Sequence, residues 1–115
     1  MAEDTQRIRP LPSASLHILL ALAGEEKHGY RIMRDVEELS DGSVKMGPGT
    51  LYGSIKKLLT QGLVEESDER PDPVLDDERR RYYRLTALGA QVRAAELERL
   101  SALVRRASAP RLRGA

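Results

Sequence analysis

One segment near the middle of the chain combines small, hydroxyl-bearing and basic side chains with no acid. Between residues 43 and 62 the charged residues are Lys45, Lys56 and Lys57, although the chain has 19 basic and 18 acidic residues and a net charge of +1. Ammonium groups and hydroxyls can bind phosphate oxygens and base edges, and small residues allow a close approach. The segment therefore has a composition suited to contact with a nucleic acid.

Helical spacing divides this segment into two faces. Gly47-Pro48 can open a helix, because a proline at the first helical position loses only a donor that is unpaired there anyway. An apolar face collects Leu51, Ile55, Leu58 and Leu59. The opposite face collects Gly49, Thr50, Gly53, Lys56, Lys57 and Thr60, with Tyr52 on its flank. An ordinary solvated face is also polar, but the absence of acids favours a helix that enters the major groove of DNA. Tyr52 either contacts a phosphate or packs beneath the first strand of the sheet.

A second basic group follows, after an acidic stretch. Gly62 can end the helix in a left-handed conformation, and residues 63–66 and 79–85 then predict two strands. The second strand begins with Arg79, Arg80 and Arg81. Consecutive side chains on a strand alternate in direction, so we expect at most two of these arginines to contact DNA. The loop between the strands is acidic, which argues against its deep insertion into a groove.

Other helices must hold these two groups in place. We expect a buried apolar helix from Ser13 or Ser15, either of which can cap it, to about Ala23, and a second helix from about His28 to Leu39. The fold class is mainly α with a small two-stranded β wing: a winged helix-turn-helix followed by one C-terminal helix. The expected divisions are a flexible arm (1–12), the DNA-binding domain (13–86), a dimerisation helix (87–107) and a flexible basic tail (108–115).

The apolar stripe rotates along the C-terminal helix, which Thr86 can cap. Leu88 and Val92 lie on one face. A displaced face carries Leu97, Leu100, Val104 and Ala107. The first face suits the chain's own core and the second suits a partner helix in a homodimer. The alternative is a helix that lies flat on its own domain.

Several function classes are disfavoured by composition. The chain has no cysteine, so it can form neither disulfides nor thiolate metal sites. The apolar run from Leu16 to Ala23 is short for a membrane span, and we expect a soluble cytoplasmic protein. His17 and His28 lack partners at metal-binding spacing. We therefore expect structural histidines, no cofactor and no enzymatic activity.

Four motifs occur in a characteristic order, namely His28-Gly29-Tyr30-Arg31-Ile32, Gly49-Thr50-Leu51-Tyr52-Gly53-Ser54-Ile55-Lys56-Lys57-Leu58, Gly62-Leu63-Val64-Glu65 and Arg81-Tyr82-Tyr83-Arg84-Leu85-Thr86-Ala87-Leu88-Gly89. Together they resemble the short form of the PadR family of bacterial transcriptional regulators. The resemblance implies a homodimeric repressor that binds an inverted-repeat operator and is often released by a small-molecule effector. It also implies DNA contacts by Tyr30, Thr50, Tyr52 and the wing arginines.

Two hypotheses follow from the sequence. The first is a dimeric regulator that represses transcription from a palindromic double-stranded operator. The second is a winged-helix module that uses the same face for a protein partner.

Overall fold

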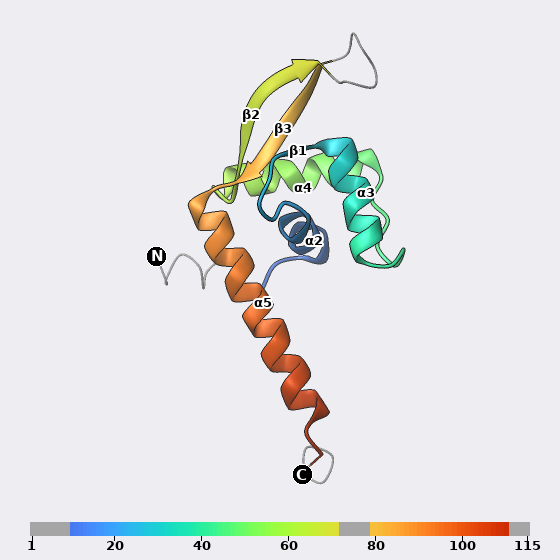
Figure 1. Cartoon of the computed structure of the whole chain (residues 1–115), viewed down its shortest axis with the longest axis vertical. Coiled ribbons are helices and arrows are strands. Elements are labelled where there is room, and N and C mark those ends of the chain that lie inside the picture. The colour runs from blue at the N-terminus through green and yellow to red at the C-terminus, as the bar shows by residue number, and fades with distance from the viewer. Residues whose placement is uncertain (1–9, 72–78, 111–115) are drawn as a thin grey trace.

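The computed structural model describes the backbone of residues 10–71 and 79–110 and the side chains of residues 10–67 and 81–110. The helices and strands in these ranges are shown in Figure 1. In chain order they are α2 (Ser13–Ala21), β1 (Lys27–His28), α3 (Gly29–Leu39), α4 (Pro48–Thr60), β2 (Val64–Pro71), β3 (Arg79–Leu85) and α5 (Ala87–Ser108). The expected winged helical fold with a long C-terminal helix is confirmed.

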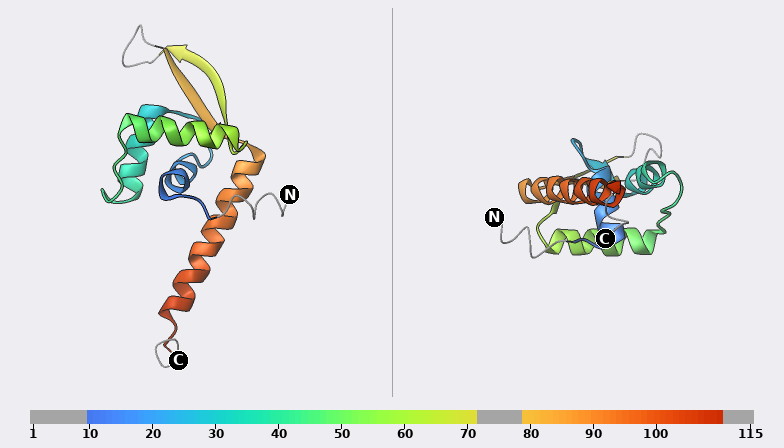
Figure 2. Two further views of the ribbon diagram at one scale, coloured as in Figure 1. Left: turned by 180° about the vertical axis from the view of Figure 1, so that it is seen from behind. Right: turned by 90° about the horizontal axis from the view of Figure 1, so that it is seen from below.

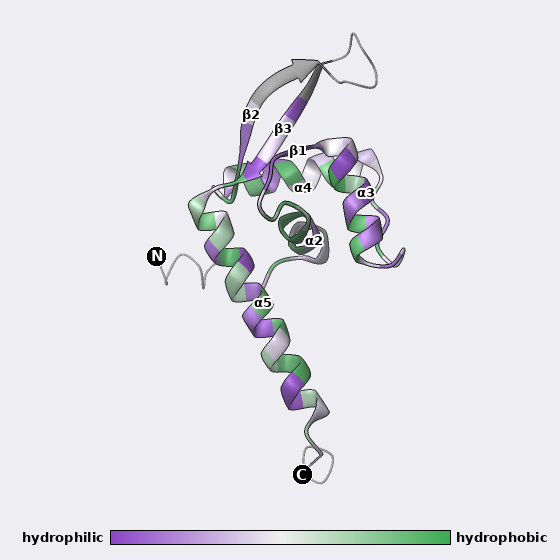
Figure 3. Ribbon diagram, viewed as in Figure 1, coloured by the Kyte–Doolittle hydropathy of each residue, from purple (hydrophilic) through white to green (hydrophobic). Residues whose placement is uncertain are grey.

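Helix α2 lies at the centre of the domain and contacts α3, α4 and α5 (Figures 1 and 2). It is apolar over most of its surface (Figure 3), and Ile18 and Leu19 have no exposed surface. A helix that is apolar on all sides must be buried. The surrounding helices each turn an apolar stripe toward it, through the buried residues Ile32, Val36, Leu51, Ile55, Leu58 and Val92.

The ends of α2 differ from the expectation. Neither Ser13 nor Ser15 caps the helix, because Ser13 is its first helical residue and Ser15 is buried. The residue at the cap position is Pro12, with no side-chain hydrogen bond. The helix ends at Ala21 rather than at Ala23, and Gly24 follows with a φ of 80°. That positive φ belongs to a turn that glycine adopts readily.

The start of the domain lies closer to the N-terminus than the sequence suggested. Leu11, which we placed in a flexible arm, belongs to the hydrophobic core. Its backbone N–H donates to a carboxylate oxygen of Glu96 at 3.2 Å, and Glu96 has no exposed surface. The guanidinium of Arg99 binds the same carboxylate at 2.9 and 3.1 Å. This hydrogen bond raises the pKa of Arg99. A buried carboxylate on α5 thus holds the segment before α2, whereas residues 1–9 lie outside the described residues.

The sheet has three strands rather than the expected two, in the order β1-β3-β2, with both pairings antiparallel. The added strand is β1, in which Lys27 and His28 pair with Tyr83 and Tyr82. We expected the second helix to start there. A strand of two residues has no alternating pattern of its own, so its extended conformation comes from pairing with β3.

A compact junction connects α4, the wing and α5. Gly62 has a φ of 75°, as expected for a glycine that ends a helix. Thr86 donates its hydroxyl to the carbonyl of Gly62 at 2.6 Å and accepts the N–H of Gly89 at 2.9 Å, so it is the expected cap of α5. The backbone of Gly89 lies directly against the carbonyl oxygen of Leu63, with no room for a Cβ. The direction of α5 is therefore fixed by a backbone contact.

The second half of α5 extends beyond the rest of the domain (Figure 1). Val92 is fully buried, but farther along the helix Leu97, Leu103 and Val104 are 38%, 51% and 63% exposed. Leu100 is half-buried and Ala107 is exposed. The apolar face that we expected on this part of α5 is thus uncovered within one chain, and Leu103 adds to it.

Replacing Gly89 by alanine should test the junction. The new methyl group would meet the Leu63 carbonyl, so we expect a loss of about 1–3 kcal/mol in the free energy of unfolding, measured by urea titration. Gly53→Ala is the matched control, since Gly53 lies in α4 with open space around it. That variant should gain about 0.5–1 kcal/mol from helix propensity. Equal stability of the two variants would contradict the proposed close approach.

Candidate nucleic-acid interface

The exposed face of α4 has the composition that the sequence predicted. Leu51, Ile55 and Leu58 are at most 2% exposed and pack into the core. The other side of the helix carries the exposed residues Gly49, Thr50, Gly53, Lys56, Lys57 and Thr60. No acid occurs on α4. The burial of one face thus turns the small, basic face toward solvent, where it can approach a phosphate backbone.

Tyr52 lies on the flank of this face. Its phenol packs directly over Gly29, the first residue of α3, and fills the space that a side chain at position 29 would need. The residue is nevertheless 47% exposed. Tyr52 therefore joins α4 to the start of α3 and still presents part of its ring to solvent, whereas we had considered packing beneath the first wing strand.

The start of α3 carries the next candidate contact. Tyr30 is the second residue of the helix and is 56% exposed. His28 caps the helix, because its Nδ1 accepts the N–H of Arg31 at 3.1 Å. The His28 ring also meets Tyr82 of β3 edge to face, with centroids 5.5 Å apart. His28 thus has the structural role that we expected, and it links α3 to the wing.

The other histidine is also structural. In α2, the Nδ1 of His17 donates to the carbonyl oxygen of Ser13 at 2.7 Å.

Among residues 10–71 and 79–110, no group of histidine, cysteine, aspartate and glutamate is arranged to hold a metal ion. Within the same ranges, no helix has the length and apolarity needed to cross a membrane.

Acids accompany the described arginines of the wing. Arg81 is exposed and pairs with Glu66 across the strands at 3.3 Å, while Arg84 pairs with Glu65 at 2.8 Å. Exposed pairs of this kind contribute little to stability, so a phosphate could replace the carboxylate. Arg79 and Arg80 lie in β3, but their side chains and the acidic loop of residues 72–78 lie outside the described residues.

Lys45 completes the predicted set and is exposed in the link between α3 and α4. Viewed from behind, α4 lies below the wing and beside α3, and the end of α5 lies on the opposite side of the molecule (Figure 2). The fold therefore brings the elements that carry Tyr30, Tyr52 and Arg81 to one end of the domain.

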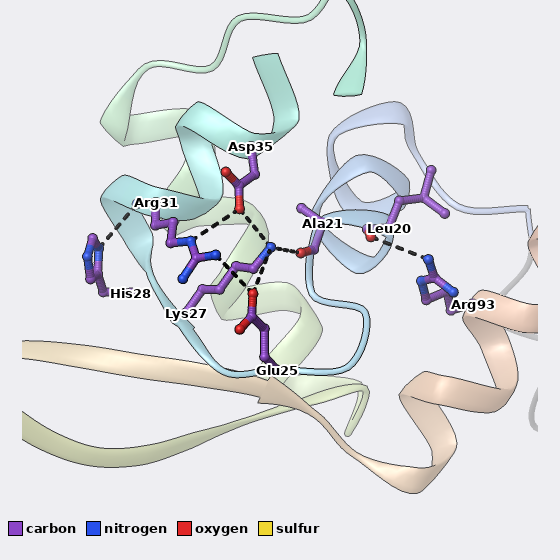
Figure 4. Close-up of polar contacts among 8 residues, drawn as sticks. All are labelled: Leu20, Ala21, Glu25, Lys27, His28, Arg31, Asp35 and Arg93. Atoms are coloured by element: carbon purple, nitrogen blue, oxygen red, sulfur yellow. Dashed lines mark hydrogen bonds and ion pairs between the residues drawn. The ribbon is translucent and has the colours of Figure 1, made fainter. Parts of the chain in front are cut away.

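Sequence reasoning missed a charged cluster behind this end. It consists of Glu25, Lys27, Arg31 and Asp35 (Figure 4). The spacing of Arg31 and Asp35 is a recognisable helical pair, but Lys27 stands in a polar stretch that gave no sign of its burial.

A scan against protein-family models identifies residues 18–95 as a match to the Transcriptional regulator PadR-like family. The chain belongs to this family. The resemblance inferred from the motifs is thus confirmed, and the protein is a DNA-binding transcriptional regulator of the PadR type rather than an enzyme.

Curated relatives support the assignment to the PadR-like family. The transcriptional regulator Rv3488 of Mycobacterium tuberculosis is 36% identical over 90 residues, which are 78% of each chain. An uncharacterised 37.1 kDa protein in a transposon of Streptomyces fradiae is 32% identical over 100 residues. The match covers 84% of this chain but 26% of that protein, so the chain spans about a quarter of its length.

Solved PadR-like structures share the fold. The Bacillus subtilis PadR in complex with operator DNA superposes with a TM-score of 0.65 at 23% identity. The similarity covers 76% of this chain and 48% of that one. At this level of identity the comparison establishes the winged helix-turn-helix fold.

The wing strand β3 should give this PadR-like protein a pH-dependent stability. Tyr83 is 5% exposed, and burial, with Glu66 next in importance, raises the pKa of its phenol above 10.0. Above that pH the unfolded chain loses the phenolic proton more readily than the folded one, so stability falls as pH rises. The free energy of unfolding should therefore decline more steeply for the wild type than for Tyr83→Phe between about pH 9 and 11. Urea titrations of both proteins over this pH range test the prediction. A difference in unfolding free energy that stays constant with pH would contradict it.

Proposed function

We propose that this PadR-like protein is a homodimeric repressor that binds an inverted-repeat operator, with α4 in the major groove and the wing as a modulator. The observation that carries the proposal is the exposed, acid-free face of α4. That face combines small residues, which permit close approach, with Lys56 and Lys57, which suit phosphate contacts.

The neighbouring elements support this placement. Tyr30 and Lys45 are exposed beside α4, and Tyr52 presents part of its ring there. Arg81 of β3 is exposed and would extend the basic surface toward a minor groove. Since Glu66 already accompanies Arg81, the wing contributes less to affinity than α4 does. The B. subtilis PadR that shares the fold was crystallised with operator DNA.

The dimer half of the proposal rests on α5. Leu97, Leu100, Val104 and Ala107 lie along the part of the helix that leaves the domain, with Leu103 beside them. A contiguous apolar stripe of this kind is stabilised by a second copy of the same helix. A two-fold axis at this seam would present two α4 helices to successive major grooves, about one helical turn of DNA apart.

The direct test is duplex binding. DNA from upstream of the protein's own gene should bind in fluorescence anisotropy, and the affinity should fall linearly on a logarithmic salt scale because counterions are released. Folded protein that binds no duplex above background at low salt would contradict DNA binding. If a protein partner is then captured through the α4 face, the interaction-module alternative is correct.

Lys56→Glu with Lys57→Glu should abolish most of this binding. Each protomer of the dimer loses two lysines that face phosphates, so the salt slope should fall by about two to four and the affinity by at least about tenfold, with unchanged helicity in far-ultraviolet circular dichroism. Arg105→Glu with Arg106→Glu is the control of equal charge change. Both arginines are exposed at the far end of α5, so this variant should retain most of the affinity. An equal loss in both variants would show that net charge alone controls binding.

Leu100→Asp with Val104→Asp should dissociate the dimer. Two carboxylates in an apolar seam are costly to bury, so sedimentation should show a folded monomer with weak operator binding. The control is again Arg105→Glu with Arg106→Glu, which alters the side of α5 turned away from the apolar stripe and should leave a dimer. A dimeric mass for the aspartate variant would refute the proposed seam.

A further inference from the structure

Lys27 is a buried lysine with two well-placed partners. Only 8% of the surface of Lys27 is exposed. The Nζ atom donates to the carbonyl oxygen of Ala21 at 2.5 Å and to a carboxylate oxygen of Asp35 at 2.7 Å (Figure 4). Lysine is rarely buried unless it is paired, and here the pairing joins three elements: α2 through Ala21, β1 through Lys27 and α3 through Asp35.

The ammonium group of Lys27 lies at the C-terminal end of α2, where a cation is electrostatically favoured. Ala21 is the last residue of α2, and unpaired carbonyls at a helix C-terminus attract cations. From the other side, the guanidinium of Arg93 on α5 reaches the carbonyl of Leu20 at 3.5 Å (Figure 4). The end of the central helix is thus approached by cations from two elements.

The three residues that begin with Lys27 contact the wing, α3 and the flank of α4. Lys27 and His28 pair with β3 of the wing, and His28 caps α3 immediately before Tyr30. The phenol of Tyr52, from α4, packs against the backbone of Gly29. A displacement of this segment would therefore move the wing, α3 and the flank of α4 together.

We propose that Lys27 is a positioning residue for DNA recognition. By holding residues 27–29 against the end of α2, its ammonium group sets the relative placement of Tyr30, Tyr52 and the wing. The effect on DNA binding rests on the proposed function. The effect on the packing of the tyrosines rests only on the geometry of the free protein. It adds to the interface a residue that does not face the DNA.

A role in geometry is distinct from a role in stability. Replacing both members of a buried ion pair by apolar residues is often neutral for stability, whereas removing one member leaves an uncompensated charge. The informative variant is therefore Lys27→Met with Asp35→Leu, which removes both charges. Lys27→Met alone is less informative, because Asp35 would keep its ion pair with Arg31 at 3.5 Å.

The composition provides a specific probe of the geometry. The chain has four tyrosines and neither tryptophan nor phenylalanine. All four tyrosines, at positions 30, 52, 82 and 83, lie on α3, α4 or β3 next to this segment. Near-ultraviolet circular dichroism therefore reports on their packing alone. We expect the double variant to lose most of this signal while its far-ultraviolet spectrum stays unchanged.

The DNA measurement compares the operator with a scrambled duplex of equal length at fixed salt. The double variant should bind the operator at least about tenfold more weakly and the scrambled duplex within about twofold of wild type, because Lys56 and Lys57 are intact. Val92→Ala, a core change on α5, is the control for lost stability. It should keep both the tyrosine signal and the preference for the operator.

The outcomes separate the two proposals. An unchanged tyrosine signal in the double variant, or an equal loss of signal or operator preference in Val92→Ala, overturns the role of Lys27. If wild-type protein prefers no duplex, the proposed operator function fails. The tyrosine signal then still decides whether Lys27 positions the surface.

Discussion

The burial of α2 is the constraint on which the other features of the domain depend. Its sequence is apolar on nearly every side, so three helices must surround it, each with its own apolar stripe. The chain has no phenylalanine or tryptophan, and the core is filled by aliphatic residues such as Ile18 and Leu19, with Tyr83 the one aromatic side chain among its buried members in the described residues. Once α4 turns its aliphatic stripe toward α2, its small basic face has to point to solvent. The proposed recognition surface is thus a consequence of how the core is closed.

Close backbone contacts then fix the directions of the elements around that core. The backbone of Gly89 lies against the Leu63 carbonyl and sets the departure of α5 from the wing. Gly29 makes room for Tyr52, and this contact draws α3 and α4 together. Glycine permits both because a side chain there would collide with its neighbour. The same packing leaves the second half of α5 outside the domain, where its apolar stripe can meet a second copy.

Charges act differently in the two environments. On the surface, the lysines of α4 have no acids on their own helix, while the described wing arginines are accompanied by Glu65 and Glu66. This distribution makes α4 the stronger candidate for phosphate contacts and the wing the weaker one. In the interior, Lys27 and Glu96 are held by hydrogen bonds that join separate elements. Buried charges of this kind require defined partners, which makes them suited to fixing geometry.

Local sequence by itself determined most of the elements and the orientation of the candidate interface. Helical periodicity placed α3, α4 and α5, and the cap at Thr86 and the stop at Gly62 needed only neighbouring residues. The tertiary structure decided what depends on residues far apart in the chain. The strand β1 exists because β3 pairs with it. Leu11 is held at the core because its N–H binds Glu96, which lies 85 positions along the chain. Lys27 is buried because α2 and α3 supply its partners. Short-range patterns carry no signal for such contacts, since each half looks like an ordinary polar or loop segment until the chain folds back on itself.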